Sequence, residues 1–524
     1  MKAYIRPLNA IISLSDKSGL SELSEGLMRH GINIFSTGGT AAVLKNLDCP
    51  VTDISTYTKS PEIMNGRLKT LHPKIHGGLL GRRDKDNAVM LENEIEGIDL
   101  LFVNFYPFER VLEQHSEDFE KIIESIDIGG PAMVRSAAKN FSSVGVVVDT
   151  NDYELIVEQL DKNSGKISFE TRLYLAKKAF THISRYDAAI SNFFSSANWR
   201  EESLEEFPET ITVQHVDGLI MRYGENPHQK ACFYKEKNPP EGSISKARKK
   251  QGKDLSFNNI SDSDVAWACV SALLKPACVI VKHGNPCGVA QSSDLVSSYR
   301  MAYSTDPSSA FGGIISFNRR VNEDLAKVLL EQQFLEVLLA PSFSEEALAV
   351  LATKENVRVL ELPALVLDRK LLDYRKVAGG LLVQELDQSE DLAKNFKLVT
   401  NIAPSDSQHE DLSLAWNVSK FVKSNAIVLT NGGMTYGIGA GQTSRVMSLR
   451  VAIIKAADEG LSLKSSCLAS DAFFPFRDSV DIAAKAGIGA IIQPGGSLRD
   501  EEVISAANDA GIAMLFTGKR HFRH

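Results

Sequence analysis

The stretch Ala277-Cys-Val-Ile-Val-Lys282-His283-Gly284-Asn-Pro-Cys-Gly288 carries the clearest indication of the fold. Apolar, β-branched residues followed by a Gly/Asn/Pro turn predict a buried strand over 277–282. Open α/β sheets bind their ligands beyond the ends of such strands. A lysine and an imidazole placed there can stabilise a negative charge and move a proton in one pocket. The alternative is a lysine that leaves the core for solvent beside a hydrogen-bonded histidine, and the other motifs favour the first interpretation.

Strand and helix patterns continue on the C-terminal side of this motif. Further strands are predicted at 312–317, 425–430 and 489–493, separated by helical stretches. The strand at 425–430 ends in Thr430-Asn431-Gly432, much as the first one ends in Lys282-His283-Gly284. We therefore expect two related α/β subdomains from about residue 210 onward, although their sequence similarity is too weak to prove a duplication.

The N-terminal region has its own alternation of strands and helices. Apolar strands are predicted at 8–14, 32–35, 100–105 and 144–148, and a helical stretch from about 150 to 195 follows them. This order predicts a parallel sheet with helices on both faces. The polar, acidic segment 195–209 is the best candidate linker, and we expect one domain over 1–199 and another over 200–524.

The composition is that of a globular protein with ample core. The chain has 524 residues, of which 43% are hydrophobic, and its length suggests roughly three or four domains. A net charge of -8 argues against nonspecific nucleic-acid binding, although local basic clusters still suit small anions. Six cysteines without a C-x-x-C pair indicate a reducing cytoplasm. Neither a signal peptide nor an apolar run of about 18 residues is found, so no membrane span is expected.

Two loops in the N-terminal region have the composition of phosphate sites. Thr37-Gly38-Gly39-Thr40 follows a predicted strand and precedes a helix-like stretch, and Ser15-Asp-Lys17 follows the preceding strand. Glycines permit close approach of a phosphate, and a helix N-terminus adds N–H donors and a favourable dipole. Each loop alone is more simply a turn with an N-cap. Because the loops follow successive strands, the two interpretations are evenly balanced.

A third loop, Gly66-Arg67-Leu-Lys69-Thr70-Leu-His-Pro-Lys74-Ile-His76-Gly-Gly, concentrates cationic side chains and shows no amphipathic helix period. It is interpreted either as a solvated loop or as a loop that binds phosphate and supplies a base. Farther along, Asn104-Phe-Tyr106 ends a strand, and Asp127-Ile-Gly129 forms an acidic turn before a helix. Four side chains could converge at one sheet edge and move protons without metal or flavin: Lys69, Tyr106, Asp127 and Lys139.

The C-terminal region contains three further motifs of interest. Arg222-Tyr223-Gly-Glu-Asn-Pro-His-Gln carries an arginine suited to phosphate or carboxylate. The segment 470–478 joins three phenylalanines to two aspartates, which suits a pocket for a flat heterocycle, although aromatics of this kind also form plain core. The basic C-terminus, 519–524, is either a disordered tail or part of a site for an anion.

Together these motifs resemble a bifunctional purine-biosynthesis family, which combines AICAR (phosphoribosylaminoimidazolecarboxamide) formyltransferase with IMP cyclohydrolase. In chain order the matching motifs are S-x-S-D-K-S-G, G-R-x-K-T-L-H-P, D-I-G-G, R-Y-G-x-N-P-H-Q, K-H-x-x-P, G-I-G-A-G-Q-x-S-R and S-D-A-F-F-P-F-R-D. The resemblance implies an α/β fold with an N-terminal methylglyoxal-synthase-like parallel-sheet domain. It also implies a C-terminal half of two cytidine-deaminase-like α/β subdomains.

The deaminase resemblance does not extend to zinc chemistry. Zinc deaminases need H-x-E and P-C-x-x-C. In this chain Pro286-Cys287 is followed three residues later by Ala290, and no H-x-E motif stands nearby. No catalytic metal is therefore expected. A regulatory nucleotide-sensing module is a second alternative, which would explain the phosphate loops but neither Lys282-His283 nor the aromatic turn.

For the first reaction, the resemblance implies formyl transfer from 10-formyltetrahydrofolate, as co-substrate, to the 5-amino group of AICAR. His283 would move the proton, and Lys282 would stabilise the oxyanion and assist the leaving folate nitrogen. Asn425 and Asp478 would orient amide and folate groups. The implied substrate contacts in this region are Arg222, Tyr223, Asn259, Phe311, Gly312, Arg445, Phe473, Arg520 and His524.

For the second reaction, the resemblance implies dehydrative ring closure of formyl-AICAR to IMP. Lys69, Tyr106, Asp127 and Lys139 would share the proton transfers, without an assignment of each step. The implied contacts to the nucleotide are Ser13, Ser15, Lys17, Thr37, Gly38, Gly39, Thr40, Arg67, Thr70, Asn104 and Gly129. The implied partners are AICAR, formyl-AICAR, IMP and reduced folate, in a cytoplasmic homodimer whose transformylase site lies at the dimer interface, with no nucleic acid and no membrane.

Overall fold

The computed structural model describes residues 2–64, 66–365, 371–388 and 395–524. Internal contacts divide the chain into two compact units, Met1–Gln214 and His215–His524. The sequence placed this boundary after residue 199. The contacts place it later because the segment after 199 returns to the last helix of the first unit: the Thr212 N–H donates to Asn192 Oδ1 over 2.8 Å.

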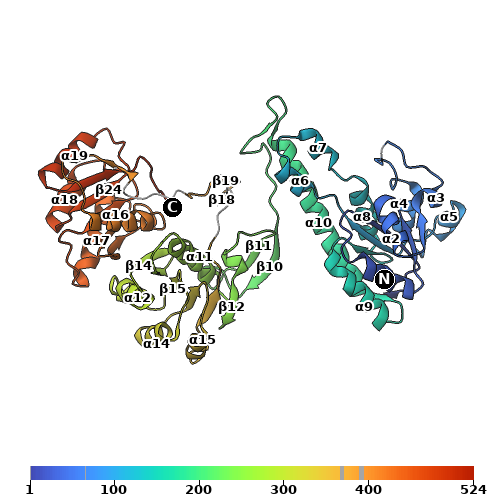
Figure 1. The fold of residues 1–524 in the computed structure, drawn as a ribbon, viewed down its shortest axis with the longest axis horizontal. Coiled ribbons are helices and arrows are strands. Elements are labelled where there is room, and N and C mark those ends of the chain that lie inside the picture. The colour runs from blue at the N-terminus through green and yellow to red at the C-terminus, as the bar shows by residue number, and fades with distance from the viewer. Residues whose placement is uncertain (1, 65, 366–370, 389–394) are drawn as a thin grey trace. The chain divides into compact units, whose positions relative to one another are not determined.

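The first unit is built on a parallel sheet with the strand order β4-β3-β2-β5-β6, all five strands lying within the described residues (Figure 1). Its strands are β2 (Asn9–Leu14), β3 (Asn33–Ser36), β4 (Val51–Asp53), β5 (Leu100–Asn104) and β6 (Gly145–Val147). The four strands predicted in this region correspond to β2, β3, β5 and β6. The prediction of a parallel sheet is confirmed.

Helices cover both faces of this sheet, as its almost uninterrupted apolar strands require. They are α1 (Leu20–Arg29), α2 (Gly38–Asn46), α3 (Ile54–Thr58), α4 (Pro73–Leu80), α5 (Asn87–Glu92), α6 (Phe108–Gln114), α7 (Phe119–Glu124), α8 (Gly129–Lys139), α9 (Tyr153–Lys162) and α10 (Phe169–Ser196). Alternate residues of one strand enter different cores: Ile11 packs with α4 and α8, whereas Ile12 packs with α1 and α9. Two short antiparallel pairs complete the unit, β1 (Tyr4–Ile5) with β7 (Ile167–Ser168) and β8 (Ala197–Asn198) with β9 (Ser203–Leu204).

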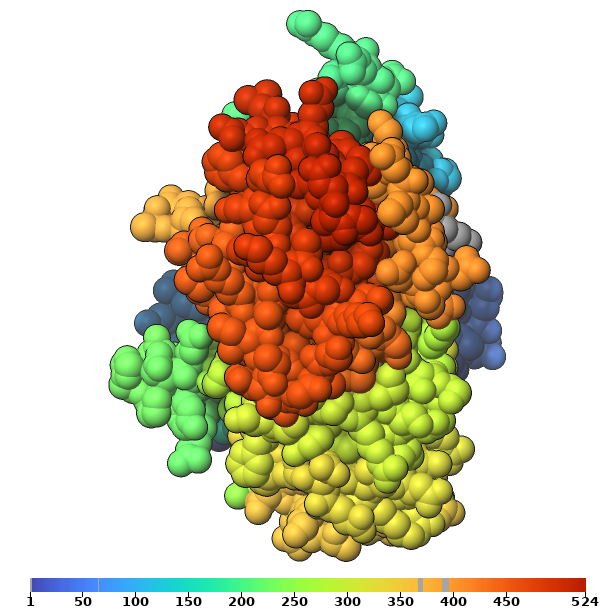
Figure 2. Space-filling view, turned by 90° about the vertical axis from the view of Figure 1, so that its left-hand side faces the viewer, coloured from blue at the N-terminus to red at the C-terminus, as the bar shows by residue number. Residues whose placement is uncertain are grey.

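The second unit is dominated by a mixed sheet of 12 strands among its described residues, in the order β12-β17-β16-β15-β13-β14-β22-β21-β23-β24-β25-β20. Residues 248–361 form one side, here the first subdomain, and residues 397–516 form the other, the second subdomain. Figure 2 shows the two, green-yellow and orange-red, lying side by side on one face. The strands predicted at 277–282, 312–317, 425–430 and 489–493 all lie in this sheet and are confirmed.

The first subdomain contains an edge strand, a helix, a hairpin and three more strands separated by helices. Its elements are β12 (Arg248–Gln251), α11 (Phe257–Ser271), β13 (Ala277–Lys282), β14 (Asn285–Gln291), α12 (Leu295–Ser304), α13 (Pro307–Ala310), β15 (Ile314–Phe317), α14 (Glu323–Gln332), β16 (Val337–Ala340), α15 (Glu345–Leu351) and β17 (Arg358–Glu361).

The second subdomain repeats this order. Its elements are β20 (Lys397–Leu398), α16 (Asp406–Ser419), β21 (Ile427–Asn431), β22 (Met434–Gly439), α17 (Arg445–Asp458), β23 (Cys467–Ser470), α18 (Asp478–Ala486), β24 (Ala490–Gln493), α19 (Asp500–Asp509) and β25 (Ala513–Phe516). Among the described residues of this unit, two antiparallel hairpins lie outside the main sheet, β10 (His215–Met221) with β11 (Ala231–Glu236) and β18 (Leu372–Val377) with β19 (Gly380–Glu385).

Strand pairing relates the two subdomains by an approximate two-fold arrangement. Each hairpin strand, β13 or β21, pairs antiparallel with the next strand, β15 or β23, and two parallel pairings follow before an antiparallel edge strand. The two sides meet where β14 pairs with β22 at Ala290 and Met434. The topology therefore provides the evidence for two related subdomains that the sequence alone could not supply.

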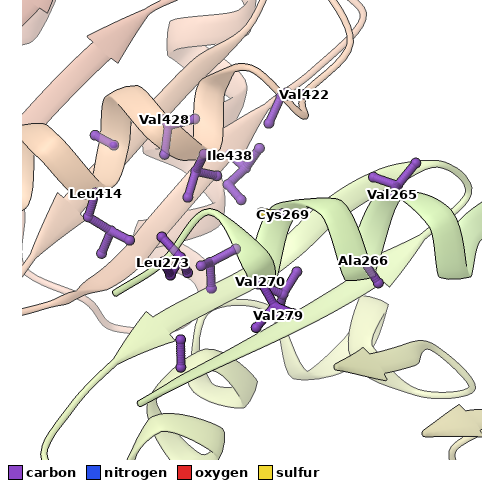
Figure 3. Close-up of a cluster of buried hydrophobic side chains, with 14 of the residues drawn as sticks. Val265, Ala266, Cys269, Val270, Leu273, Val279, Leu414, Val422, Val428 and Ile438 are labelled. Carbon is purple, nitrogen blue, oxygen red and sulfur yellow. The ribbon is translucent and has the colours of Figure 1, made fainter. Parts of the chain in front are cut away.

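The largest apolar core lies between the two subdomains, and Figure 3 shows side chains of both gathered there. From the first subdomain come Val265, Ala266, Cys269, Val270, Leu273 and Val279, and from the second come Leu414, Val422, Val428 and Ile438. Burial of this shared surface stabilises the two subdomains together. In the described part of the chain, no helix is long and apolar enough to cross a membrane.

Candidate active sites

In the first unit, three of the segments that the sequence selected follow strands β2, β3 and β5. Because these strands are parallel, their carboxyl ends share one edge of the sheet. The side chain of Asn104, at the end of β5, holds the loop after β2: its Oδ1 accepts the N–H groups of Ser15 at 2.6 Å and Asp16 at 3.0 Å. Asn104 is thus committed to shaping the loop around Lys17.

The loop after β3 lies against two lysines. A β-carbon at Gly38, where φ is +56°, would lie 3.5 Å from Lys69 Nζ, and one at Gly39 would lie 3.8 Å from Lys17 Cε. Gly38 is the first residue of α2, so its N–H and that of Gly39 are unpaired by helix geometry. Two ammonium groups beside a helix N-terminus form an environment that favours an anion such as phosphate.

The charge of Lys69 also acts on an acidic group, Asp127. Burial raises the pKa of Asp127, while the Gly130 N–H, the charge of Lys69 and the Gly129 N–H oppose that rise. The Gly130 N–H donates to Asp127 Oδ1 over 2.9 Å. A carboxyl group with a raised pKa beside a lysine can accept and return a proton.

Other residues predicted for this site are placed as follows. Thr70 is 4% exposed, and its Oγ1 lies within 2.6 Å of a β-carbon position at Gly129. Thr40 is buried and its hydroxyl exchanges hydrogen bonds with the backbone of Leu14. Thr37 is the buried N-cap residue of α2, and Ser13 lies half-buried on β2.

Three of the four proposed proton-transfer residues lie at this sheet edge, and one does not. Tyr106 follows β5 and is half exposed. Lys139 ends α8, whereas Gly129 begins it, so about 15 Å of helix separates the two backbone positions. The structure therefore does not bring Lys139 beside Asp127. Arg67 points toward Glu124 and forms an exposed ion pair with it.

In the second unit, the hairpin β13–β14 carries the Lys282-His283 pair. Lys282 pairs with Asn285, which leaves His283 and Gly284 as a two-residue loop. The Lys282 ammonium donates to the backbone carbonyl of Phe311. A β-carbon at Gly312 would lie 3.4 Å from Lys282 Nζ. Phe311 and Phe334 are largely exposed beside it, with ring centroids 5.8 Å apart.

A hydrogen bond joins this turn to the second subdomain. Asn285 Oδ1 accepts the N–H of Lys423 over 2.9 Å, and Asn285 Nδ2 donates to the His283 carbonyl over 3.2 Å. Asn425 stands two residues beyond Lys423. Asn285, which the sequence did not single out, therefore links the Lys282-His283 turn to the segment that carries Asn425.

Arg445 supports Asn425 from inside the protein. Its guanidinium donates to Asn425 Oδ1 over 2.6 Å, to Ser470 Oγ over 2.9 Å and to the carboxylate of Asp471. The side chain of Arg445 is 8% exposed and that of Asp471 is fully buried. Removal of one partner of such a buried ion pair strongly destabilises a protein, because the other charge stays buried and unpaired. The geometry places Arg445 as a support of Asn425.

The C-terminal tail packs on the same network. The His521 N–H donates to the Asp471 carbonyl over 3.0 Å, and the His521 ring is buried 4.7 Å from the ring of Trp416. The Ser424 N–H donates to the Arg523 carbonyl over 2.9 Å. This tail is therefore fixed beside Asn425, in agreement with the site interpretation of the basic C-terminus.

The remaining predicted residues lie mainly at the surface. Phe473 is 40% exposed, and Asp478 begins α18, where its carboxylate accepts the Ser479 N–H over 2.8 Å. Arg520 and His524 are exposed on the tail. Arg222 is exposed beside the half-buried Tyr223, its guanidinium 5.6 Å from that ring.

Asn259 differs from these because its side chain is already engaged. It is 4% exposed, its Oδ1 accepts the Ser256 N–H over 3.1 Å, and its Nδ2 donates to Glu336 over 2.9 Å. These bonds form a capping box at the start of α11 and connect that helix to Glu336, the residue before β16.

Sequence reasoning missed two aspartates in this region. Asp471 was quoted within S-D-A-F-F-P-F-R-D but not selected, because nothing in the sequence separates it from its neighbours. Asp262, on α11, accepts the N–H of Gly284 over 2.7 Å. A gapless alignment of 256–291 with 405–440 would have paired Asp262 with Asp411 and indicated a shared role.

Two family models match adjacent parts of the chain. The family model described as AICARFT/IMPCHase bienzyme matches residues 137–455, and the model described as MGS-like domain matches residues 19–132. A solved structure titled "Crystal structure of ForH" is 34% identical, with the match covering 36% of this chain and 99% of that chain at a TM-score of 0.33.

The two units and their clusters therefore define a bifunctional α/β enzyme of nucleotide biosynthesis. More specifically, the chain belongs to the AICARFT/IMPCHase bienzyme family, because that model alone matches more than half of it. It transfers a formyl group from a folate-type donor to AICAR and closes formyl-AICAR to IMP. The family resemblance and the bifunctional activity expected from the sequence are confirmed.

Proposed function

We propose that the Lys282-His283 turn performs formyl transfer within residues 215–524, and that the sheet edge around Lys69 and Asp127 performs cyclisation within residues 1–214. The observation that supports the first assignment is the bond from Asn285 to Lys423, which joins the turn to the segment bearing Asn425. The second assignment is supported by the position of Lys69 beside the Gly38 loop and by the effect of its charge on the pKa of Asp127, which burial raises.

The formyl donor is proposed to be 10-formyltetrahydrofolate. The 5-amino group of AICAR is a poor nucleophile because its lone pair is conjugated with the ring and carboxamide. His283 accepts the amine proton as the nitrogen attacks the formyl carbon. Lys282 stabilises the oxyanion that forms and then protonates or hydrogen-bonds the leaving folate nitrogen. Asn425, held by Arg445, orients the carboxamide.

Substrate contacts in the second unit are proposed from side chains near this turn and tail. Arg520 and His524 are exposed cations on a tail fixed beside Asn425, and they suit the phosphate of AICAR. Phe473 and Phe311 supply aromatic surface for flat rings. Asp478 orients the folate, and Arg222 with Tyr223 completes the proposed set.

For cyclisation, the carboxamide nitrogen attacks the formyl carbonyl within one molecule, so positioning supplies much of the rate enhancement. Asp127 accepts the amide proton, and Lys69 stabilises the developing alkoxide and assists departure of water. Tyr106 is proposed as a further proton donor at the same edge. Lys139 remains a proposed participant, although α8 holds it away from Asp127 in one chain.

A cytoplasmic homodimer is proposed in addition. The hairpin β10–β11 exposes apolar side chains, with Leu219 52% and Ile220 81% exposed, and such a surface suits contact with another chain. The family resemblance implies that the transformylase site takes residues from both chains. Sedimentation of the purified protein tests this proposal, and a monomer that retains full transformylase activity contradicts it.

His283→Ala in the full chain tests the assignment of formyl transfer. Transfer is expected to fall by at least ~10²-fold, the lower range for a general base, while cyclisation of supplied formyl-AICAR continues. Gly432→Ala, at the position of the second subdomain that corresponds to His283, is the matched control and should leave transfer unchanged. Transfer at the wild-type rate in His283→Ala contradicts the assignment.

A further inference from the structure

The loop that carries His283 has an unusual backbone for a histidine. His283 has φ +52° and Gly284 has φ +71°, so both residues of the two-residue loop are left-handed. Hairpin loops of this kind favour Asn-Gly or Gly-Gly, because non-glycine residues uncommonly adopt positive φ, although Asn, Asp and His do so more often than the others. A non-glycine residue held in this region indicates a functional constraint when surrounding structure enforces it.

The second subdomain contains the same hairpin with the unstrained sequence. Asn431 pairs with Met434, and the loop between them is Gly432-Gly433, with φ values of +59° and +82°. The two hairpins also share a register shift at matching positions, Ile280/Val281 and Leu429/Thr430. The scaffold therefore forms with glycine at this position, and the histidine in the first subdomain is not needed for folding.

A carboxylate on the preceding helix holds each loop. Asp262 Oδ1 accepts the Gly284 N–H over 2.7 Å, and Asp262 also hydrogen-bonds the backbone of His283. In the second subdomain, Asp411 accepts the Gly432 N–H over 2.9 Å and the Gly433 N–H over 2.8 Å. Each aspartate precedes the second loop residue by 22 positions.

The two carboxylates differ in what lies around them. Asp411 is buried beside two glycines, and burial raises its pKa. Asp262 is half-buried; burial raises its pKa too, whereas the hydrogen bonds from Gly284 and His283 and the charge of His283 oppose that rise. Glu336, which also raises the pKa of Asp262, is held by Asn259. Only the first of the two loops places a proton-transfer group beside its carboxylate.

We propose that Asp262 is the positioning residue of the formyl-transfer site, which fixes His283 in its left-handed conformation and so aims the imidazole at the amine of AICAR. This inference rests on the proposed role of His283 and extends it. Two backbone N–H bonds determine where the Cα–Cβ bond of His283 points, and Lys282 is fixed by the same turn.

The alternative is that Asp262 only stabilises the hairpin, as Asp411 does. The duplicated scaffold separates these two roles because it supplies a carboxylate with the same bonds but no histidine. Four variants of the full chain are compared: Asp262→Ala, Asp262→Asn, Asp411→Ala and Asp411→Asn. For each, kcat and KM for AICAR in formyl transfer, cyclisation of supplied formyl-AICAR, and thermal stability are measured.

Asp262→Ala is expected to lower kcat of formyl transfer by about 10-fold or more, because displacement of a catalytic group by about 1 Å can cost 10²-fold. KM for AICAR should change by less than about 3-fold, because Asp262 acts through His283 and not on the substrate. Asp262→Asn keeps one acceptor oxygen and should recover part of kcat. Cyclisation should be unchanged in all four variants.

The Asp411 variants should lose stability to a similar extent while their formyl-transfer kcat stays within about 2-fold of wild type. Equal losses of kcat in the Asp262 and Asp411 variants, or a rise in KM alone for Asp262→Ala, overturn the inference. If Asp262→Ala does not fold, the Asn pair gives the same comparison. His283→Ala measured in parallel separates the failures: full activity there refutes the role of His283 itself, whereas an inactive His283→Ala with normal Asp262 variants refutes only the positioning role.

Discussion

The two subdomains of the second unit share a scaffold but differ at the loop where chemistry is expected. In each, the first helix has a capping box with a serine N-cap, Ser256 before α11 and Ser405 before α16, and each of these helices buries a tryptophan, Trp267 or Trp416. At the hairpin that follows, one subdomain has Lys282-His283-Gly284 and the other has Asn431-Gly432-Gly433. The scaffold is therefore retained in both, and reactive side chains stand on one loop only.

The second subdomain contributes in a different way. It supplies Asn425, the Arg445–Asp471 pair that holds it, and the tail that packs against Trp416. The two subdomains thus have different proposed roles. The first carries the groups proposed to move protons, and the second carries the groups proposed to orient the substrate. The proposed function of His283 is therefore best tested by comparison with Gly432, which occupies the same loop position in the second subdomain.

The largest expected effect comes from making the two loops alike. His283→Gly should lower formyl transfer by at least ~10²-fold, because the proposed base is lost. It should not lower stability: removing a left-handed non-glycine residue gains ~1–2 kcal/mol, and added backbone entropy in the unfolded chain offsets about half of this. Transformylase assays and urea unfolding measure both quantities.

The reverse substitution, Gly432→His, provides the control. Among the described residues, no atom other than those of Gly432 and its two chain neighbours lies within 4 Å of a β-carbon at Gly432, so only backbone strain should matter. Stability should fall by ~1–2 kcal/mol with formyl transfer unchanged. A less stable His283→Gly protein, or slower formyl transfer after Gly432→His, would contradict the view that the two loops share one scaffold and that only the first carries a catalytic group.

The cyclisation site of the first unit should respond to its own substitutions independently of the formyl-transfer site. Lys69→Met should slow cyclisation by about 10-fold or more, since a charge that stabilises the alkoxide is removed. It should also move the acid limb of the cyclisation pH profile to higher pH. The positive charge of Lys69 lowers the pKa of Asp127, so its removal raises that pKa and the basic form appears only at higher pH.

The pH profile of cyclisation with supplied formyl-AICAR measures this shift, and formyl transfer by the same protein is the internal control. An acid limb that stays in place, or that moves to lower pH, argues that Asp127 is not the group that titrates. A parallel loss of formyl transfer would mean that the two activities are not carried by separate units.

A pair of glycines tests whether the two scaffolds are equally tight. A β-carbon at Gly288 would lie 2.0 Å from the Ala302 carbonyl oxygen, and one at Gly437 would lie 2.1 Å from that of Ala452. Gly288→Ala and Gly437→Ala should each cost ~1–3 kcal/mol through overpacking of a hairpin strand against its helix. Chemical denaturation measures the loss, and costs that differ several-fold would show that the scaffolds are not equivalent.

The smallest expected effect concerns the tail. Arg520 is exposed, so Arg520→Ala should raise KM for AICAR by about 10-fold at most and leave stability unchanged. Removal of 520–524 should do more, because it also removes the buried His521 ring from Trp416 and should lower the melting temperature. Unchanged KM in Arg520→Ala would remove this arginine from the proposed site.

Much of the fold could be predicted because local pattern and tertiary role agree. The apolar run ending at Lys282 became β13 with the predicted bounds, and the alternating strands of the first region became a parallel sheet. The family motifs could be read from the sequence because each keeps its residues contiguous. Lys69 and Asp127 were selected for the same reason, as each stands in a dense short motif.

The amino-acid sequence therefore determined the order of strands and helices, the family and the residue types available for catalysis, since these depend on short-range pattern. Tertiary structure decided which of those residues meet. It placed Lys139 at the far end of α8 from Asp127, turned Arg445 inward to Asp471, and brought Asp262 beneath His283. Such contacts join residues distant along the chain, and local pattern does not encode the packing that brings them together.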